Sequence, residues 1–163
     1  MSILDFLKKK DESVSDDSIV AIANGELFDV STVSDPMFAE QMMGKSIAFK
    51  FDEDTVTLCS PVNGTLSVLF PTGHAFGVRM NNGVELLIHC GINTVDAKGK
   101  GFKLLKKKQG DTVLAGDPIV KVDLKELSSK YDMSTMLIIT NDNGKNIEFI
   151  NYGKVTKGQS IIK

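Results

Sequence analysis

The sequence is poor in the residues that build disulfide frameworks and metal sites. Its 163 residues include two cysteines, Cys59 and Cys90, and two histidines, His74 and His89. Two cysteines at this spacing form neither a disulfide framework nor a CxxC zinc knuckle, so we expect free thiols in a reducing compartment. Any imidazole chemistry in this chain must therefore use His74, His89 or both.

A surplus of basic charge and long apolar runs are also missing. Nineteen basic residues against 21 acidic ones give a net charge of −2, whereas a general nucleic-acid binder needs a basic excess to neutralise phosphates. No apolar run approaches the roughly 20 residues that span a bilayer. The apolar cluster at residues 3–7 is too short for a secretory signal. We expect a cytoplasmic protein without a nucleic-acid partner.

The organisation of the chain indicates one folded domain after a short N-terminal extension. Residues 1–10 place four apolar side chains beside three lysines, a pattern that predicts a short amphipathic helix with weak affinity for the inner face of a membrane. Residues 11–18 read DESVSDDS and are typical of a polar linker. We therefore expect a flexible, amphipathic tail and linker over residues 1–18 and a domain over residues 19–163.

Turn signals indicate the fold class. Four Asn-Gly dipeptides, which favour tight hairpins, begin at residues 24, 63, 82 and 143 and precede short apolar segments. Helical signals are limited to residues 36–43, where Asp35-Pro36 fits an N-cap followed by a first-turn proline, and to residues 124–130. The pattern predicts an all-β protein, an antiparallel β-sandwich or flattened barrel with a few short helices.

Alternation of side chains along two predicted strands brings the histidines toward one surface. Residues 84, 86 and 88 are all apolar and predict a core face, which leaves Glu85, Leu87 and His89 on the other face. The same period groups Phe70, Thr72, His74, Phe76 and Val78. We predict a shallow cleft with two imidazoles, a hydroxyl and an apolar rim. The alternative is that both histidines are unrelated surface residues.

Three chemistries could use such a pair of histidines. A metal site needs three or four ligands, and no HExxH spacing supplies the others. Nucleophilic hydrolysis needs an activated serine or cysteine, but Cys90 follows His89 directly and points to the opposite face. The third chemistry is attack of an imidazole nitrogen on phosphorus, supported by a second imidazole and a threonine. The sequence offers all of these groups.

Several motifs in a fixed order carry a family resemblance. Residues 83–95 read GVELLIHCGINTV and are followed by KGKGF at 98–102; DPMFAEQMMG stands at 35–44, SPVNGT at 60–65, FPTGHAF at 70–76 and VDL at 122–124. Together they resemble the glucose-type enzyme IIA, EIIA type 1, of the bacterial phosphoenolpyruvate-dependent sugar phosphotransferase system. The resemblance covers the chain from about residue 19 to its end, and it is closest to the free-standing, single-domain members.

The resemblance implies a β-sandwich and a function as phosphocarrier. His89 would accept a phosphoryl group on Nε2 from the phosphocarrier protein HPr, His74 would stabilise it, and Thr72 would hydrogen-bond nearby. The acceptor would be a cysteine on the IIB domain of a sugar permease, of the glucose type. The resemblance thus implies a phosphotransferase component with a phosphohistidine intermediate and no required cofactor or metal. Zinc at His74 and His89 would be adventitious or belong to an interface.

The resemblance and the residue types also predict a partner surface. Methionines give an adaptable apolar surface, and carboxylates suit a basic partner. The expected surface comprises Asp35, Phe38, Met42, Met43, Phe70, Phe76, Glu85, Leu87, Asn93, Val95 and Asp96. Core filling by the methionines and ordinary solvation of the carboxylates are the alternatives. Asn93 and Met136 depart from the family, which has aspartate and proline at these positions.

A second class of function uses the same surface. A non-catalytic regulatory binding module would hold permeases or metabolic enzymes such as kinases there without transferring phosphate. Incubation with phosphoenolpyruvate, enzyme I and HPr separates the two, because only a phosphocarrier gains an acid-labile phosphate.

Overall fold

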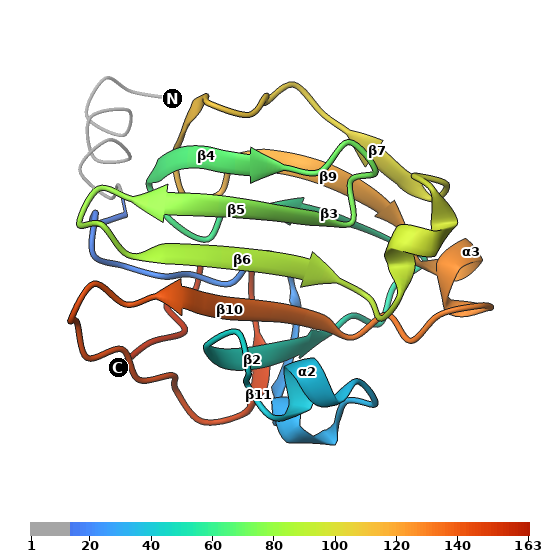
Figure 1. The fold of residues 1–163 in the computed structure, drawn as a ribbon, viewed down its shortest axis with the longest axis horizontal. Helices are drawn as coiled ribbons and strands as arrows, with labels where there is room; N and C mark the ends of the chain where they lie inside the picture. Colours follow the sequence, from blue (N-terminus) through green and yellow to red (C-terminus); the bar gives the residue numbers. More distant parts are fainter. Residues whose placement is uncertain (1–13) are drawn as a thin grey trace, which may run out of the picture.

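Two antiparallel sheets pack face to face in the computed structural model, which describes residues 14–163 (Figure 1). The larger sheet has the strand order β11-β1-β2-β10-β6-β5-β4-β8, and the smaller has the order β3-β9-β7. The strands are β1 (Gly25–Phe28), β2 (Lys45–Lys50), β3 (Thr55–Cys59), β4 (Gly64–Leu69), β5 (Ala75–Met80), β6 (Glu85–Cys90), β7 (Phe102–Leu104), β8 (Thr112–Val113), β9 (Pro118–Asp123), β10 (Thr135–Asn141) and β11 (Gly153–Val155). The predicted all-β sandwich is confirmed.

The main core lies between the two sheets and follows from alternation along the strands. Leu86 and Ile88 of β6 are buried, as are Val120 and Val122 of β9, and all four belong to one apolar cluster. Each strand thus gives every second side chain to the interior. This alternation leaves His89 on the outer face of the larger sheet, as the sequence predicts.

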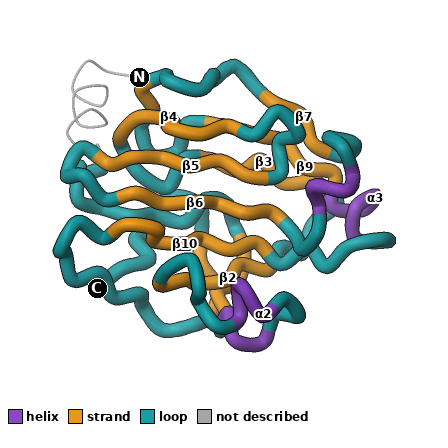
Figure 2. Tube along the Cα trace, in the orientation of Figure 1, coloured by secondary structure: helices purple, strands orange, loops and turns teal. Residues whose placement is uncertain are grey.

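A second, smaller apolar cluster covers part of that outer face. It forms where the 3-10 helix η1 (Val30–Thr32) and the helix α2 (Pro36–Ala39) pack on β2 and β10. Asp35 begins α2, because its carboxylate accepts a hydrogen bond from the Met37 amide at 2.9 Å. The helix ends well before residue 43, so the predicted helix is right in place but too long. The other predicted helix is α3 (Leu124–Ser128). Figure 2 shows α2 below β2 and α3 at the right-hand end of the strands.

The Asn-Gly pairs have two different structural roles. Asn82-Gly83 joins β5 to β6, and Asn143-Gly144 follows β10 with positive φ at both residues, as the hairpin signal predicts. Gly64 has a different role: it begins β4 beside β5 in the larger sheet, and a Cβ there would lie 2.0 Å from the Arg79 carbonyl oxygen. At this position glycine allows close backbone approach rather than a tight turn.

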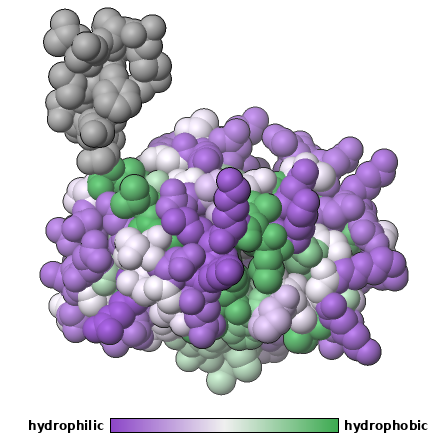
Figure 3. All heavy atoms as spheres, turned by 90° about the horizontal axis from the view of Figure 1, so that it is seen from above, coloured by the Kyte–Doolittle hydropathy of each residue, from purple (hydrophilic) through white to green (hydrophobic). Residues whose placement is uncertain are grey.

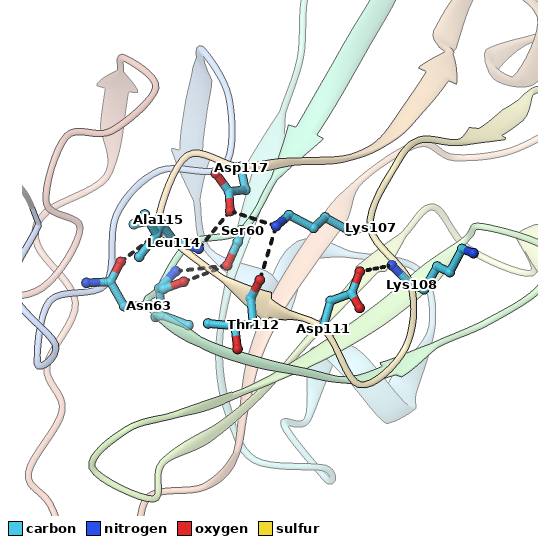
Figure 4. A network of polar contacts seen from close by, with 10 residues as sticks. Ser60, Asn63, Lys107, Lys108, Asp111, Thr112, Leu114, Ala115 and Asp117 are labelled. Carbon is cyan, nitrogen blue, oxygen red and sulfur yellow. Dashed lines mark hydrogen bonds and ion pairs between the residues drawn. The ribbon is translucent and has the colours of Figure 1, made fainter.

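The folded unit begins earlier than the sequence predicts. The Asn63 amide nitrogen donates to the Val14 carbonyl at 2.7 Å. Its side-chain oxygen accepts from the Ala115 amide at 2.8 Å (Figure 4). The Asn82 amide donates to Asp17 at 2.9 Å. Residues 14–18 are therefore fixed to the domain instead of belonging to the linker. The amphipathic helix predicted at residues 1–10 lies outside the described residues.

None of the helices within residues 14–163 has the length and apolar character needed to cross a membrane.

Candidate functional site

His89 lies near the end of β6 with its ring held in one tautomer. In the sheet register it stands between Ala75 of β5 and Met136 of β10. Its Nδ1 atom lies 2.9 Å from the Gly91 carbonyl oxygen. Because a carbonyl oxygen can only accept, Nδ1 carries the proton and donates. Nε2 of the neutral ring is left with its lone pair directed away from this contact.

His74 reaches the same place from a turn and not from a strand. Residues 70–74 form a turn closed by the Phe70 amide bonding to the Ala75 carbonyl at 3.1 Å, and β5 begins only at Ala75. Gly73 makes the turn with φ near +76°, a conformation that favours glycine. The predicted alternation from Phe70 to Val78 is therefore wrong, although its conclusion that His74 lies beside His89 holds.

The structure brings His74, Thr72 and His89 together. The two imidazole centroids are 5.2 Å apart with their planes at 79°. The Thr72 hydroxyl lies 2.6 Å from His74 Nδ1. When the hydroxyl donates to Nδ1, the proton of His74 sits on Nε2 and is available to a third group. His89 thus offers a lone pair on Nε2, and the adjacent His74 offers an N–H group on its own Nε2.

Two phenylalanine rings pack against the imidazoles, and they differ in exposure. The Phe38 centroid lies 4.8 Å from that of His89, and Phe70 meets His74 edge-on at 5.0 Å. Phe70 is 38% exposed and lies on the rim, as predicted. Phe38 is only 6% exposed, because the single turn of α2 directs it into the second apolar cluster. Its predicted place on the open rim is corrected to packing beneath His89.

Phe76 also leaves the predicted partner surface. It is 1% exposed and belongs to the main core. The side chains at the even positions of β5, Phe76, Val78 and Met80, all belong to the core between the two sheets. A partner cannot reach Phe76 in the folded protein, so its role is to support the sheet behind the histidines.

The electrostatic environment keeps both imidazoles neutral near pH 7. The pKa of His89 is lowered to about 4, first by burial and then by the neighbouring His74. The Gly91 carbonyl and Asp35 oppose this shift by favouring the charged ring. Burial also lowers the pKa of His74. Neutral His89 has the free lone pair that an attacking nitrogen requires.

The remaining apolar residues of the predicted surface are accessible around this pair. Met42 is 70% exposed, Met43 36% and Val95 52%, with Met37 beside them at 49%. Leu87 is half-buried and packs against the second apolar cluster. These residues give an exposed apolar margin, with the methionines on and after α2 and Val95 in the segment after β6.

The polar residues of the predicted partner surface lie in three separate places. Asp35 is half-buried and caps α2, whereas Asn93 and Asp96 are exposed in the segment after β6. Glu85 shares the outer face with His89 but stands at the other end of β6, opposite Arg79. Four residues of strand separate Glu85 from His89, or about 13 Å. Glu85 therefore contacts neither histidine.

The sequence did not reveal the groups that hold His89 in position. The buried Thr94 hydroxyl donates to the Cys90 carbonyl at 2.6 Å and fixes the loop that carries Gly91. A Cβ on Gly91 would lie 2.4 Å from a methyl carbon of Thr94. The sequence signal for these groups was a glycine two residues after His89, followed by a threonine three residues after that glycine. Cys90 faces the core, as predicted, and burial raises its pKa to about 12.

Residues 14–163 contain no group of three or more histidine, cysteine, aspartate or glutamate side chains placed to hold a metal ion. His74 and His89 alone supply two ligands, half of a tetrahedral zinc site.

Comparison with known proteins agrees with this geometry. Residues 17–145 match the model of the family described as phosphoenolpyruvate-dependent sugar phosphotransferase system, EIIA 1. A glucose-specific EIIA component of Staphylococcus aureus (strain COL) is 35% identical over 156 residues, which are 94% of this chain and 92% of that protein. The solved glucose permease IIA from Mycoplasma capricolum has a TM-score of 0.83 at 35% identity, covering 89% of this chain and 93% of that one.

Longer relatives contain the same domain as one part. A glucose-specific EIICBA component of Staphylococcus carnosus (strain TM300) is 39% identical over 145 residues, which are 88% of this chain. This chain spans about a fifth of that protein, since the match covers 21% of it. The match to one part of the EIICBA component and the match over most of a separate EIIA component lead to the same assignment. The chain belongs to the EIIA 1 family of the phosphoenolpyruvate-dependent sugar phosphotransferase system, a family of phosphotransferase components.

Proposed function

We propose that His89 Nε2 accepts a phosphoryl group from HPr and passes it to a cysteine on the IIB domain of a glucose-type sugar permease. The observation that carries this proposal is the bond from His89 Nδ1–H to the Gly91 carbonyl. It leaves the Nε2 lone pair free, and the lowered pKa keeps that lone pair unprotonated at neutral pH. The ring is thus a nucleophile before any partner arrives.

The transfer needs little covalent chemistry from the protein. The Nε2 lone pair forms a new N–P bond while the P–N bond to the donor histidine breaks, and that bonding pair returns to the donor imidazole. In the onward step the cysteine thiolate attacks phosphorus, and the bonding pair returns to Nε2. Each step exchanges one bond to phosphorus for another, so positioning and charge stabilisation make the largest contribution.

His74 supplies that stabilisation in the proposal. With Thr72 donating to its Nδ1, the His74 Nε2–H points a hydrogen-bond donor at the oxygens of the phosphoryl group on the neighbouring ring. A preorganised donor at a developing charge is worth far more in a dry site than in water. Phe38 and Phe70 pack against the two rings and cover part of their surface.

Both protein partners would dock on the exposed margin around the site. Met42, Met43 and Val95 give apolar contacts, and Asp35 and Asp96 give a negative contribution that suits a basic partner. We place regulated permeases or kinases, where they exist, on the same margin. Zinc would bind His74 and His89 only where a partner adds ligands, and the transfer itself requires no metal or other cofactor. We also propose that the protein acts at the cytoplasmic face of the membrane.

The test is a mass measurement after incubation with phosphoenolpyruvate, enzyme I and HPr. Wild type gains one phosphate, which acid removes, and the His89→Gln variant gains none. Equal uptake by the two proteins rules out His89 as the acceptor. No uptake by wild type would favour the regulatory binding module, provided that HPr itself is phosphorylated in the same tube.

A further inference from the structure

The near-zero net charge of the chain hides a strong separation of charge. Residues 98–126 contain eight lysines and four carboxylates, a local charge of +4. Because the whole chain carries −2, the other residues carry −6. One part of the protein is thus as basic as many anion-binding surfaces, although the overall composition does not show it.

The fold gathers these lysines on β7, β9 and the segment that joins them. Lys103 of β7 stands directly opposite Lys121 of β9, and both are exposed. Like charges directly opposite on paired strands are destabilising. Lys106, Lys107 and Lys108 follow β7 and, together with Lys103 and Lys121, make up what we call the basic face.

Few carboxylates neutralise the basic face. Within residues 14–163 the side-chain ion pairs are Lys107 with Asp117 at 3.6 Å and Lys100 with Glu126 at 3.4 Å. The ammonium groups of four of the five lysines of the basic face therefore have no carboxylate oxygen within 4.0 Å in the described part of the chain. This positive charge, including the repulsive cross-strand pair, is uncompensated in the free protein.

Exposed apolar side chains accompany the lysines. Leu114 is 60% exposed, and Leu104 and Val68 are each 38% exposed. β7 and the segment after it run along the upper side of the molecule in Figure 1. Figure 3 looks onto this side and shows a hydrophobic strip between long hydrophilic side chains. Lysines around exposed leucines form a surface suited to the boundary between lipid headgroups and acyl chains.

The N-terminal segment enters the fold beside this surface. The amide nitrogen of Asn63 donates to the Val14 carbonyl. The side-chain oxygen of Asn63 accepts from the Ala115 amide, next to the exposed Leu114 (Figure 4). Thirteen residues precede Val14, and they include three consecutive lysines and the apolar cluster of residues 3–7. Their attachment point lies on the same side as the lysines of the fold.

We propose that the basic face binds the anionic surface of a lipid bilayer. The folded domain itself makes the contact, in addition to any contribution of residues 1–13. Lysine ammonium groups are compact charges without the bidentate fork of arginine, and none of the residues 98–126 is arginine. Such charges suit a diffuse layer of headgroups better than fixed recognition of a nucleic acid. Leu104 also lies beside the turn that carries His74, since a Cβ on Gly73 would be 3.5 Å from its Cδ2 atom, so docking here places the phosphoryl site at the edge of the bilayer.

The sharpest test reverses one charge at the repulsive pair. Lys121→Glu removes a lysine from the face and turns the repulsion with Lys103 into attraction, so the melting temperature should stay equal or rise. A lysine near an anionic membrane contributes about fivefold in affinity. We therefore expect at least about a fivefold loss in partition of the full chain onto vesicles of phosphatidylcholine with phosphatidylglycerol. The matched control is Lys145→Glu, an equal charge change in the turn after β10, which should change partition far less.

Further measurements give outcomes that support or overturn the proposal. Neither wild type nor variant should bind vesicles of phosphatidylcholine alone. Deleting residues 1–13 should weaken partition while Lys121→Glu still lowers it further. The proposal is overturned if the deletion abolishes partition and Lys121→Glu has no effect in the full chain. It is also overturned if Lys121→Glu weakens binding to a single-stranded oligonucleotide as much as binding to the vesicles at the same salt concentration. Phosphoryl uptake from HPr in solution should be unchanged by Lys121→Glu.

Discussion

The Nδ1 atom of His89 is hydrogen-bonded to the carbonyl oxygen of Gly91, two residues further along the chain, at 2.9 Å. This contact decides which ring nitrogen can react. It requires the αL-like backbone of Gly91, where φ is +84°. A side chain at that position would collide with Thr94. In the proposed transfer, the reactivity of His89 therefore depends on the backbone conformation of Gly91.

The two histidines should separate in a transfer assay. His74→Gln should still take up phosphate from HPr, because His89 Nε2 is intact, but it should pass the phosphate to IIB roughly 10²–10³ times more slowly, as is typical for loss of one transition-state donor. Single-turnover transfer from the phosphorylated variant to IIB measures this rate. If onward transfer proceeds at the wild-type rate, His74 has no role in stabilising the phosphoryl group.

Folding stability should fall as the pH drops from about 6.5 toward 4. Folded His89 has a pKa lowered to about 4, whereas the unfolded chain binds the proton near the ordinary value of 6.5. Protons thus favour the unfolded state in this window, and the contribution is fully present only above it. Urea unfolding across this pH range measures the effect, and His89→Gln should show a flatter pH profile than wild type. If the stability of wild type and of His89→Gln changes with pH in the same way, the pKa of His89 is not lowered.

Thr94 should act as a positioning residue for the reacting ring. Thr94→Val removes the buried hydrogen bond to the Cys90 carbonyl, and leaving such a group unpaired costs about 1–3 kcal/mol. Thr94→Ser keeps the hydroxyl and serves as the conservative control. We expect the valine variant to lose the single tautomer of His89, which the ¹⁵N chemical shifts of the ring report, and the serine variant to keep it. Unchanged ¹⁵N shifts in a folded valine variant would limit Thr94 to a structural role.

Substitution of Phe38 should lower the stability of the fold, whereas substitution of Met42 should weaken docking without lowering stability. Phe38→Ala should lower the free energy of unfolding by about 3–5 kcal/mol, because the ring fills the second apolar cluster. Met42→Ser, at a 70% exposed position, should leave stability within about 0.5 kcal/mol of wild type. It should nevertheless raise the concentration of HPr needed for half-maximal uptake, with little dependence on salt. Unchanged HPr dependence would place α2 and the turn after it outside the interface.

Asn93→Asp should speed association with HPr at low ionic strength. Asn93 is exposed and has φ near +60°, a conformation that aspartate also tolerates. The added negative charge steers a basic partner, and the advantage should fade near physiological salt, where the Debye length is about 8 Å. Stopped-flow association rates over a salt series test this. An advantage that persists at high salt would show that the charge acts by direct contact instead of steering.

The placement of His89 could be predicted from the sequence because it lies in a regular strand, whereas the local structure around His74 could not. In β6 the alternation is unbroken, so the sequence correctly places His89 outward and Cys90 inward. The strand around His74 was predicted too long, because Gly73 takes a positive φ and replaces the first part of the strand with a turn. The prediction still paired His74 with His89, since the turn returns the side chain to the same surface.

Other errors arose where distant segments decide the local structure. Phe38 was predicted on the partner surface, but the second apolar cluster also includes residues of η1, β2 and β10, and the ring packs among them. Residues 14–18 looked like a linker by composition, yet Asn63 and Asn82, more than 45 residues away in sequence, hold them to the domain. Local pattern cannot anticipate side-chain contacts across such separations.

In the transfer we propose, one specific nitrogen, Nε2 of His89, carries the phosphoryl group. The most direct measurement is NMR of the protein labelled with ¹⁵N in its histidine rings and phosphorylated through HPr, with ³¹P–¹⁵N couplings to identify the bonded atom. The account predicts a single phosphohistidine, bonded through Nε2 of His89, with Nδ1 of that ring still protonated. A phosphoryl group on Nδ1 of His89, or on either nitrogen of His74, would contradict it.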